Sequence, residues 1–97
     1  MKVNINPIHF KTDKKLDEYI TDKINKLSKF HQEIISSEVI LKLDNTSAPE
    51  NKIVEIRLII AGNDLFAIKK AKTFEEATDL AVDALRRQIE KTKDNWK

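Results

Sequence analysis

The chain contains stretches in which apolar residues recur at every second position and stretches in which they recur every three to four positions. The first pattern is typical of half-buried β-strands and the second of amphipathic helices. Residues 2–6 (KVNIN) have the two-residue period. Pro7 follows them and predicts an edge strand or a bulge, because proline cannot donate to a strand ladder. Residues 8–10 are a candidate continuation of this strand.

Two long segments have the helical period. Residues 12–30 are predicted to form the first helix, with Thr12 as its N-cap. Residues 73–93 are predicted to form the second, where Thr73 and Glu76 make a capping box. The apolar side chains expected to face the core are Leu16, Ile20, Ile24 and Leu27 in the first helix, and Phe74, Ala77, Ala81, Leu85 and Ile89 in the second.

Three further strands are predicted between the helices, over residues 37–44, 52–61 and 64–71. Gly62 and Asn63 separate the last two and favour a tight hairpin. The inward-facing residues are expected to be Val39, Leu41 and Leu43, followed by Val54, Ile56, Leu58 and Ile60. The predicted fold is therefore α+β with the order β-α-β-β-β-α. Two helices pack on one face of a four-stranded, mostly antiparallel sheet, as in double-stranded-RNA-binding folds.

Length and composition limit the class of protein. The 97 residues make one domain, 1–97, and a chain with 40% hydrophobic and 35% charged residues is typical of a soluble globular protein. Cysteine is absent, which excludes disulfides, thiol catalysis and Cys-ligated zinc. The N-terminus lacks the apolar run of a signal peptide, and no stretch is long and apolar enough to span a bilayer. We therefore expect a cytoplasmic protein with no membrane partner.

Catalytic and metal-binding patterns are not found in the sequence. His9 and His31 have no partner at metal-ligand spacing. The acidic residues of the second predicted helix lie in its N-terminal half, where the helix dipole favours carboxylates without any ligand; they are Glu75, Glu76, Asp79 and Asp83. One glycine cannot build a phosphate-binding loop. We expect no enzyme activity, no cofactor, no metal and no small-molecule substrate.

Basic residues are more informative than the net charge of +2. Lys23, Lys26 and Lys29 follow one another at three-residue spacing and form a ridge on one flank of the first predicted helix. On the second helix, Arg87 and Lys91 share one flank, whereas Arg86 and Lys93 share the other. If the helices lie side by side, the lysine ridge could border the flank of Arg87 and Lys91 and bind closely spaced phosphates. From these patterns alone, nucleic-acid contact and a merely solvated basic surface both remain open.

A protein-interaction module is the alternative function. Ile40 and Ile59 are apolar at positions that should face solvent on the outer side of the sheet, and Phe66 is a further candidate there. An exposed apolar surface of this kind would bind a protein partner rather than a ribosome.

Three stretches together resemble the short form of the ribosome hibernation promoting factor family, which includes the ribosome-associated inhibitor protein Y. The first runs from the opening strand through Thr12 at the helix start to DKINKLSKF (22–30), and the others are SSEVILKLD (36–44) and EEATDLAVDALRRQIEKTK (75–93); together they span nearly the whole chain. The last is similar to the family's Ala-x-Asp…Leu-x-Arg-Gln-Leu-x-Lys-x-Lys helix. The resemblance implies a factor of stress or stationary phase that occupies the tRNA and mRNA channel of the small ribosomal subunit, blocks translation and preserves idle ribosomes.

The resemblance also implies which residues contact small-subunit rRNA. These are Lys23, Lys26, Lys29, Arg87 and Lys91, with Arg86 and Lys93 as weaker candidates. The chain departs from the family pattern at Thr73-Phe74-Glu75, where Asp-Met-Tyr is common, and at Ala84, where lysine is common. Arg86 is expected to compensate for the lysine. We expect no C-terminal dimerisation domain, and the resemblance leaves open whether the protein promotes ribosome dimers.

Overall fold

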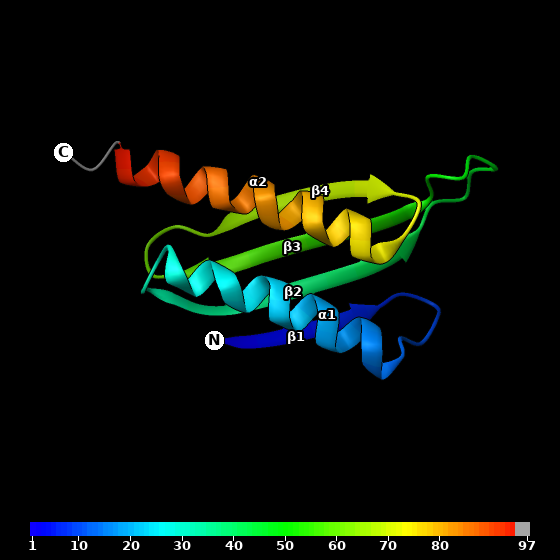
Figure 1. Ribbon diagram of the computed structural model, residues 1–97, viewed down its shortest axis with the longest axis horizontal. Coiled ribbons are helices and arrows are strands. Elements are labelled where there is room, and N and C mark those ends of the chain that lie inside the picture. Colours follow the sequence, from blue (N-terminus) through cyan, green and yellow to red (C-terminus); the bar gives the residue numbers. More distant parts are fainter. Residues whose placement is uncertain (95–97) are drawn as a thin grey trace.

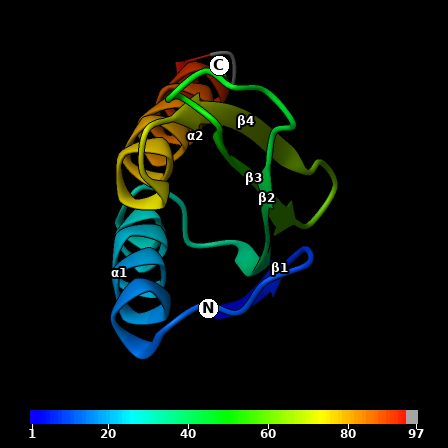
Figure 2. The same cartoon turned by 90° about the vertical axis from the view of Figure 1, so that its right-hand side faces the viewer.

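The computed structural model describes residues 1–94, and the side chains of residues 1–91. It has the predicted order and layers (Figure 1), so the predicted fold class is confirmed. Both helices cover one face of the sheet, and no described element covers the other (Figure 2). The elements are β1 (Lys2–Pro7), α1 (Lys14–Asn25), the short 3-10 helix η1 (Lys26–Lys29), β2 (Ile34–Leu43), β3 (Lys52–Ile60), β4 (Leu65–Ala71) and α2 (Phe74–Asp94).

The sheet is mixed. Its strands lie in the order β1-β2-β3-β4, with β1 parallel to β2 and the other neighbours antiparallel. β1 is an edge strand, as Pro7 predicts, and α1 is the crossover that a parallel pair requires. Because α1 returns the chain across one face and α2 follows β4 onto the same face, the two helices lie next to each other.

The core lies between the helices and the inner face of the sheet. Ile56 and Leu58 of β3 are fully buried there, and Leu85 of α2 packs into the same cluster. Most of the predicted inward positions are confirmed, because they are buried in the structure: Ile20, Ile24, Leu27, Val39, Leu41, Val54, Ile56, Leu58, Ile60, Ala77, Ala81, Leu85 and Ile89. Leu43 is the exception among the strand residues. It is 48% exposed because β2 ends there, beyond the cover of the helices.

The first helix is shorter than predicted. Asp13, rather than Thr12, is its N-cap, and the Asp13 carboxylate accepts from the Leu16 backbone N–H at 2.8 Å. Thr12 instead donates its hydroxyl to the Asp17 carboxylate at 2.6 Å. Aspartate and threonine are both good caps, so composition alone does not place this boundary to the residue. The last predicted turns form the 3-10 helix η1, which keeps Leu27 in the core.

The strand ends differ from the predictions in three places. Residues 8–10 do not continue β1, because His9 has a positive φ of 67° and turns the chain towards α1. β2 begins at Ile34, three residues early, through an irregularity in its register with β3. The predicted tight hairpin is instead a loop of residues 61–64, in which Gly62 has a φ of 92° that glycine adopts without strain.

The second helix begins as predicted. The Thr73 hydroxyl accepts from the Glu76 backbone N–H at 3.0 Å, which is the capping interaction expected of this pair. Phe74 stacks on Phe10 with ring centroids 5.2 Å apart and fixes the start of α2 beside the loop that precedes α1. Further along α2, Gln88 donates its side-chain amide to the Phe66 carbonyl of β4 at 2.9 Å. Within the described residues, no helix is long and apolar enough to cross a membrane.

Candidate nucleic-acid interface

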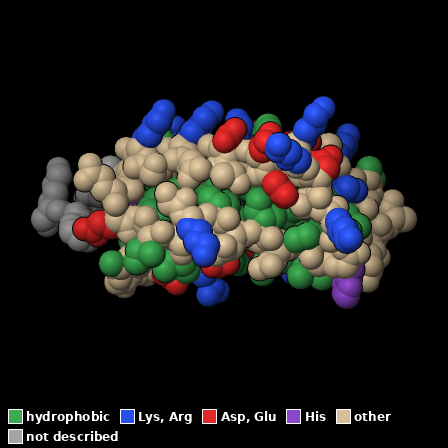
Figure 3. All heavy atoms as spheres, turned by 90° about the horizontal axis from the view of Figure 1, so that it is seen from below, with side chains coloured by type: hydrophobic (Ala, Val, Ile, Leu, Met, Phe, Trp, Pro, Cys, Tyr) green, Lys and Arg blue, Asp and Glu red, His purple; other side chains and the backbone are tan. Residues whose placement is uncertain are grey.

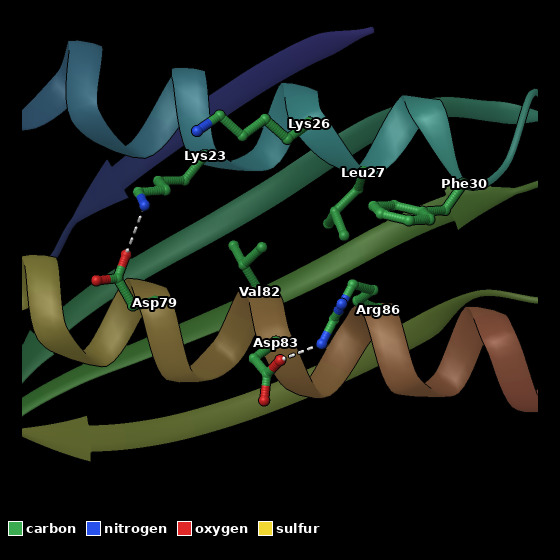
Figure 4. A pocket seen from close by; sticks show the side chains of 8 residues that line it. All are labelled: Lys23, Lys26, Leu27, Phe30, Asp79, Val82, Asp83 and Arg86. Atoms are coloured by element: carbon green, nitrogen blue, oxygen red, sulfur yellow. Dashed lines mark hydrogen bonds and ion pairs between the residues drawn. The ribbon is translucent and has the colours of Figure 1, made fainter.

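A groove lies between α1 and α2 on the outer surface of the helix layer. The two helices run in the same direction, so both C-terminal ends lie on one side of the molecule (Figure 1). The groove has a volume of about 400 Å³, and Figure 4 shows the side chains that line it. These are Lys23, Lys26, Leu27, Phe30, Asp79, Val82, Asp83 and Arg86. Its floor is therefore apolar and its walls are charged.

The groove brings cations of the two helices together, but not in the predicted combination. Lys23 and Lys26 line it from the α1 side, and Arg86 lines it from α2. Arg87 lies on the outer flank of α2 with 75% of its side chain exposed, and Lys91 is also exposed. The predicted contact between the lysine ridge and the Arg87 flank is therefore wrong. Arg86, the weaker candidate, faces the lysines, because α2 turns its other flank towards α1.

The other two candidates lie outside the groove or outside the described side chains. Lys29 ends η1 and is exposed, near the C-terminal end of α1. Lys93 belongs to α2, but its side chain lies outside the described residues, as does Trp96. The structure thus places six candidate cations on the helix layer: Lys23, Lys26, Lys29, Arg86, Arg87 and Lys91.

Asp79 connects the two helices across the groove. Its carboxylate accepts the Tyr19 hydroxyl at 2.8 and 2.9 Å and pairs with the Lys23 ammonium at 3.6 Å. Figure 4 shows Lys23 reaching from α1 towards this carboxylate. The hydrogen bond to Asp79, followed by partial desolvation, raises the pKa of Tyr19 above its ordinary value, because both favour the neutral phenol. The Lys23 ammonium also lies 5.5 Å from the centre of the Tyr19 ring.

Asp83 holds two arginines at once. One carboxylate oxygen accepts a hydrogen bond from Arg86 at 3.0 Å, and the other forms an ion pair with the Arg87 guanidinium at 2.8 Å. Consecutive helix residues point about 100° apart, so the shared carboxylate draws together two guanidinium groups that would otherwise diverge. The Asp83 side chain is 40% exposed, and ion pairs this open to water contribute only about 0.2–1 kcal/mol each. The two ion pairs therefore order the arginine side chains, but another anion can replace the carboxylate at little cost in free energy.

The outer surface of the helix layer is rich in lysine and arginine. Figure 3 shows these side chains projecting along the upper edge of the molecule, which is the helix layer in that view, with acidic side chains between them towards the right. The left part of this edge corresponds to the C-terminal ends of both helices. Cations are favoured there by the negative ends of two parallel helix dipoles. The position suits an anionic partner that binds across both helix ends.

Sequence patterns did not identify the two aspartates as part of this surface. The acidic residues of α2 were attributed to the helix dipole, and Glu75 and Glu76 fit that interpretation because they lie in its first turn. Asp79 and Asp83 instead face the groove. The spacings of three and four residues from Asp83 to Arg86 and Arg87 would have indicated ion pairs on α2. The contacts of Asp79 with Tyr19 and Lys23 instead depend on how α1 and α2 pack.

No metal or catalytic centre accompanies the groove in the described part of the chain. No three His, Asp or Glu side chains among those residues are grouped so that they could hold a metal ion. His9 is exposed in the turn after β1, and His31 accepts the Glu33 backbone N–H at 3.1 Å in the turn before β2. Neither imidazole lines the groove, although His31 directly follows Phe30, which does.

The uncovered face of the sheet carries apolar side chains beside paired charges. Phe66 and Ile68 of β4 are 41% and 52% exposed, while Ile40 and Ile59 are only partly exposed. The predictions placed Ile40, Ile59 and Phe66 on this face but missed Ile68. Lys70 pairs with Asp44 at 2.9 Å, Lys42 pairs with Glu55, and the Arg57 guanidinium lies 5.7 Å from the Phe66 ring centre. This face thus has few unpaired charges for an anionic partner.

Sequence comparison finds one family model that matches residues 3–97, described as Sigma 54 modulation protein / S30EA ribosomal protein. Among curated relatives, a ribosome hibernation promoting factor from Klebsiella oxytoca is 26% identical over 97 residues, which is all of this chain and 98% of that protein. One from Pseudomonas putida is 28% identical over 94 residues, covering 97% of this chain and 88% of that protein.

Solved structures agree with the fold. A ribosomal subunit interface protein from Coxiella burnetii superposes with a TM-score of 0.86 at 19% identity, covering 97% of this chain and 99% of that one. The N-terminal domain of Protein Y from Thermus thermophilus gives 0.82 at 18% identity, covering 95% of this chain and 99% of that one. Because the family model matches almost the whole length, the chain belongs to the Sigma 54 modulation protein / S30EA ribosomal protein family.

Proposed function

We propose that this protein is a ribosome hibernation factor. It binds small-subunit rRNA in the tRNA and mRNA channel, inhibits translation, and preserves idle ribosomes under stress or in stationary phase. The observation that carries the proposal is the helix face, the outer surface of α1, η1 and α2, which holds Lys23, Lys26, Lys29, Arg86, Arg87 and Lys91. The names of the relatives, ribosome hibernation promoting factor and ribosomal subunit interface protein, support the same function.

The side chains of the helix face suit phosphates better than bases. Among the described residues, the aromatic rings of the helix layer are already engaged: Tyr19 by Asp79 and Lys23, Phe74 by Phe10, and Phe30 by the core cluster on which it packs. Base stacking, on which single-strand recognition depends, therefore has no free platform there. Lysines and arginines that follow a backbone and read its shape are typical of contacts to double-stranded RNA.

The proposed contacts differ in whether a carboxylate of the protein already holds the cation. Lys26, Lys29 and Lys91 have no carboxylate partner among the described residues and are available at once. Lys23, Arg86 and Arg87 are held by Asp79 and Asp83 and must exchange that partner for a phosphate. Lys93 is retained as a contact from its place on α2. Because the ion pairs are exposed, this exchange costs little.

Purified small subunits provide the test of binding. We expect the protein to cosediment with them at low salt, and the double variant Lys26→Glu, Arg87→Glu to bind at least about 100-fold more weakly, because two phosphate contacts become repulsive. The matched control is Lys2→Glu, Lys11→Glu, which removes the same charge from exposed positions outside the helices. Failure of the wild-type protein to cosediment at low salt, or equal binding by the two double variants, would contradict the proposal.

A second experiment addresses inhibition and the position in the channel. Saturating protein should lower both mRNA and initiator tRNA binding to small subunits, and the Lys26→Glu, Arg87→Glu variant should not. If bound protein leaves mRNA and tRNA binding unchanged, the channel is the wrong location even though the ribosome is the right partner.

The protein-interaction module remains the second candidate, because Phe66 and Ile68 are exposed on the uncovered face. Salt separates the two functions. Binding through the helix face weakens steeply with salt, whereas binding through apolar side chains does not. A partner whose affinity is unchanged from low to moderate salt would favour the sheet face.

A further inference from the structure

The most specific arrangement on the helix face is acidic, not basic. Asp79 and Asp83 lie within the groove that the cations line (Figure 4). Between them they hold three of the six candidate cations. Asp83 is the central one, since it occupies both guanidinium groups of Arg86 and Arg87. A polyanion that approaches these arginines meets a carboxylate already bound to them.

Two effects of Asp83 on RNA binding have opposite signs. The carboxylate orders two long side chains, which would help binding, and it repels the incoming phosphate, which would oppose it. Both arginines remain largely open to water, at 44% and 75% exposure, so the order imposed on them is slight. The repulsion is not slight, because a phosphate that contacts either guanidinium comes within a few ångströms of the same carboxylate. Repulsion should therefore be the larger effect.

We propose that Asp83, assisted by Asp79, limits the affinity of the helix face for RNA by competing with phosphate for Arg86, Arg87 and Lys23. This inference rests on the proposed function and adds to it a means by which the protein is released from bound RNA. The contacts divide into lysines that bind without exchange, namely Lys26, Lys29 and Lys91, and cations that bind only by giving up a carboxylate. The carboxylates remain beside the bound phosphates and favour dissociation.

Asp83→Asn is the direct test. Asparagine keeps the shape and one acceptor oxygen but removes the charge. We expect small subunits to bind the variant about three- to tenfold more tightly, which is what Coulomb's law gives for one unit charge at roughly 6 Å in a medium between water and a protein surface. We also expect a steeper dependence on salt, by about 0.7–0.9 in the slope of log K against log salt, and slower dissociation.

The matched control is Glu50→Gln. It changes the net charge equally, in the exposed loop between β2 and β3. Asp79→Asn is the second variant and should tighten binding in the same direction, through Lys23. A urea denaturation curve for each variant shows that it is folded.

Elution from heparin separates this inference from the proposed function. Heparin is a polyanion without ribosomal structure, so the competition by Asp83 should appear there as elution at higher salt for Asp83→Asn than for Glu50→Gln. Binding of Asp83→Asn equal to or weaker than that of Glu50→Gln, on both subunits and heparin, would overturn the role of Asp83. Absence of wild-type binding to subunits, with the heparin difference intact, would overturn the proposed function alone.

Discussion

Asp79 shows how one side chain can determine the relation between two helices. It lies one turn before Asp83 on α2, accepts a hydrogen bond from Tyr19 of α1 and pairs with Lys23. These contacts are the polar links between the helices at the groove, whereas Leu27, Phe30 and Val82 supply the apolar ones. The spacing of the cations on the two helices therefore depends on a carboxylate that a search for basic residues passes over.

Tyr19 reports on this link through its titration. Its pKa is raised in the folded protein, first by the hydrogen bond to Asp79, so the bond stabilises the fold below the ordinary tyrosine pKa of about 10 and is lost as the pH rises through the raised value. We expect Asp79→Asn to lower the pH at which tyrosinate absorbance appears. Tyr19 is the only tyrosine, so the absorbance has one source. Asp83→Asn is the control, and an equal shift in both variants would contradict the assignment.

Elements of this fold are stabilised mainly by their apolar faces. α2 has a fully buried stripe of Ala77, Ala81, Leu85 and Ile89 against the sheet, and its N-terminus is fixed by Thr73 and by the stacking of Phe74 on Phe10. The helix thus begins at a capped, packed end near the sheet edge and presents its outer flank to the groove.

Two leucines on α2 allow this dependence on burial to be measured. Leu85→Ala should lower the free energy of unfolding by about 2–5 kcal/mol, since the side chain is 0% exposed and its removal leaves a cavity. Leu80→Ala changes the same residue type on the same helix at 46% exposure and should cost less than about 1 kcal/mol. Urea denaturation measures both. Similar losses for the two variants would show that Leu85 does not belong to the core.

The sequence predicted the elements well because periodicity records which face is buried. Ile20 and Ile24, like Val54 and Ile56, follow from their spacing alone. It predicted the ends poorly, since Thr12 and Asp13 are both competent caps and nothing local fixes where β2 leaves the cover of the helices. The pairing across the groove depends on the rotation of α1 and α2 about their axes. For that reason the lysines were predicted on the correct helix face but next to the wrong arginine.

The whole molecule has two unlike faces. On the helix face, three of the six candidate cations have no carboxylate partner among the described residues, and the other three share two aspartates. On the uncovered sheet face, Lys42 and Lys70 are each paired with a single acid, around exposed Phe66 and Ile68. We expect an anionic partner to bind at the unpaired cations of the helix face, near the C-terminal ends of both helices.

Ile68→Lys tests this difference between the faces. It adds a cation to the sheet at an exposed position, so we expect ribosome affinity to change less than about twofold and the free energy of unfolding to change by less than about 0.5 kcal/mol. The measurements are cosedimentation with small subunits and urea denaturation. A large gain or loss of ribosome binding would show that the sheet face contacts the ribosome.

The hydrogen bond from Gln88 to the Phe66 carbonyl has a consequence for contacts between copies of the protein. β4 is the outermost strand on its side of the sheet, and the free peptide groups of such a strand can template the addition of a strand from another chain. With the Phe66 carbonyl occupied by Gln88, an incoming strand would lose one acceptor and would meet α2 at that point. The free edge of β4 therefore offers one acceptor fewer to a strand from another copy at Phe66.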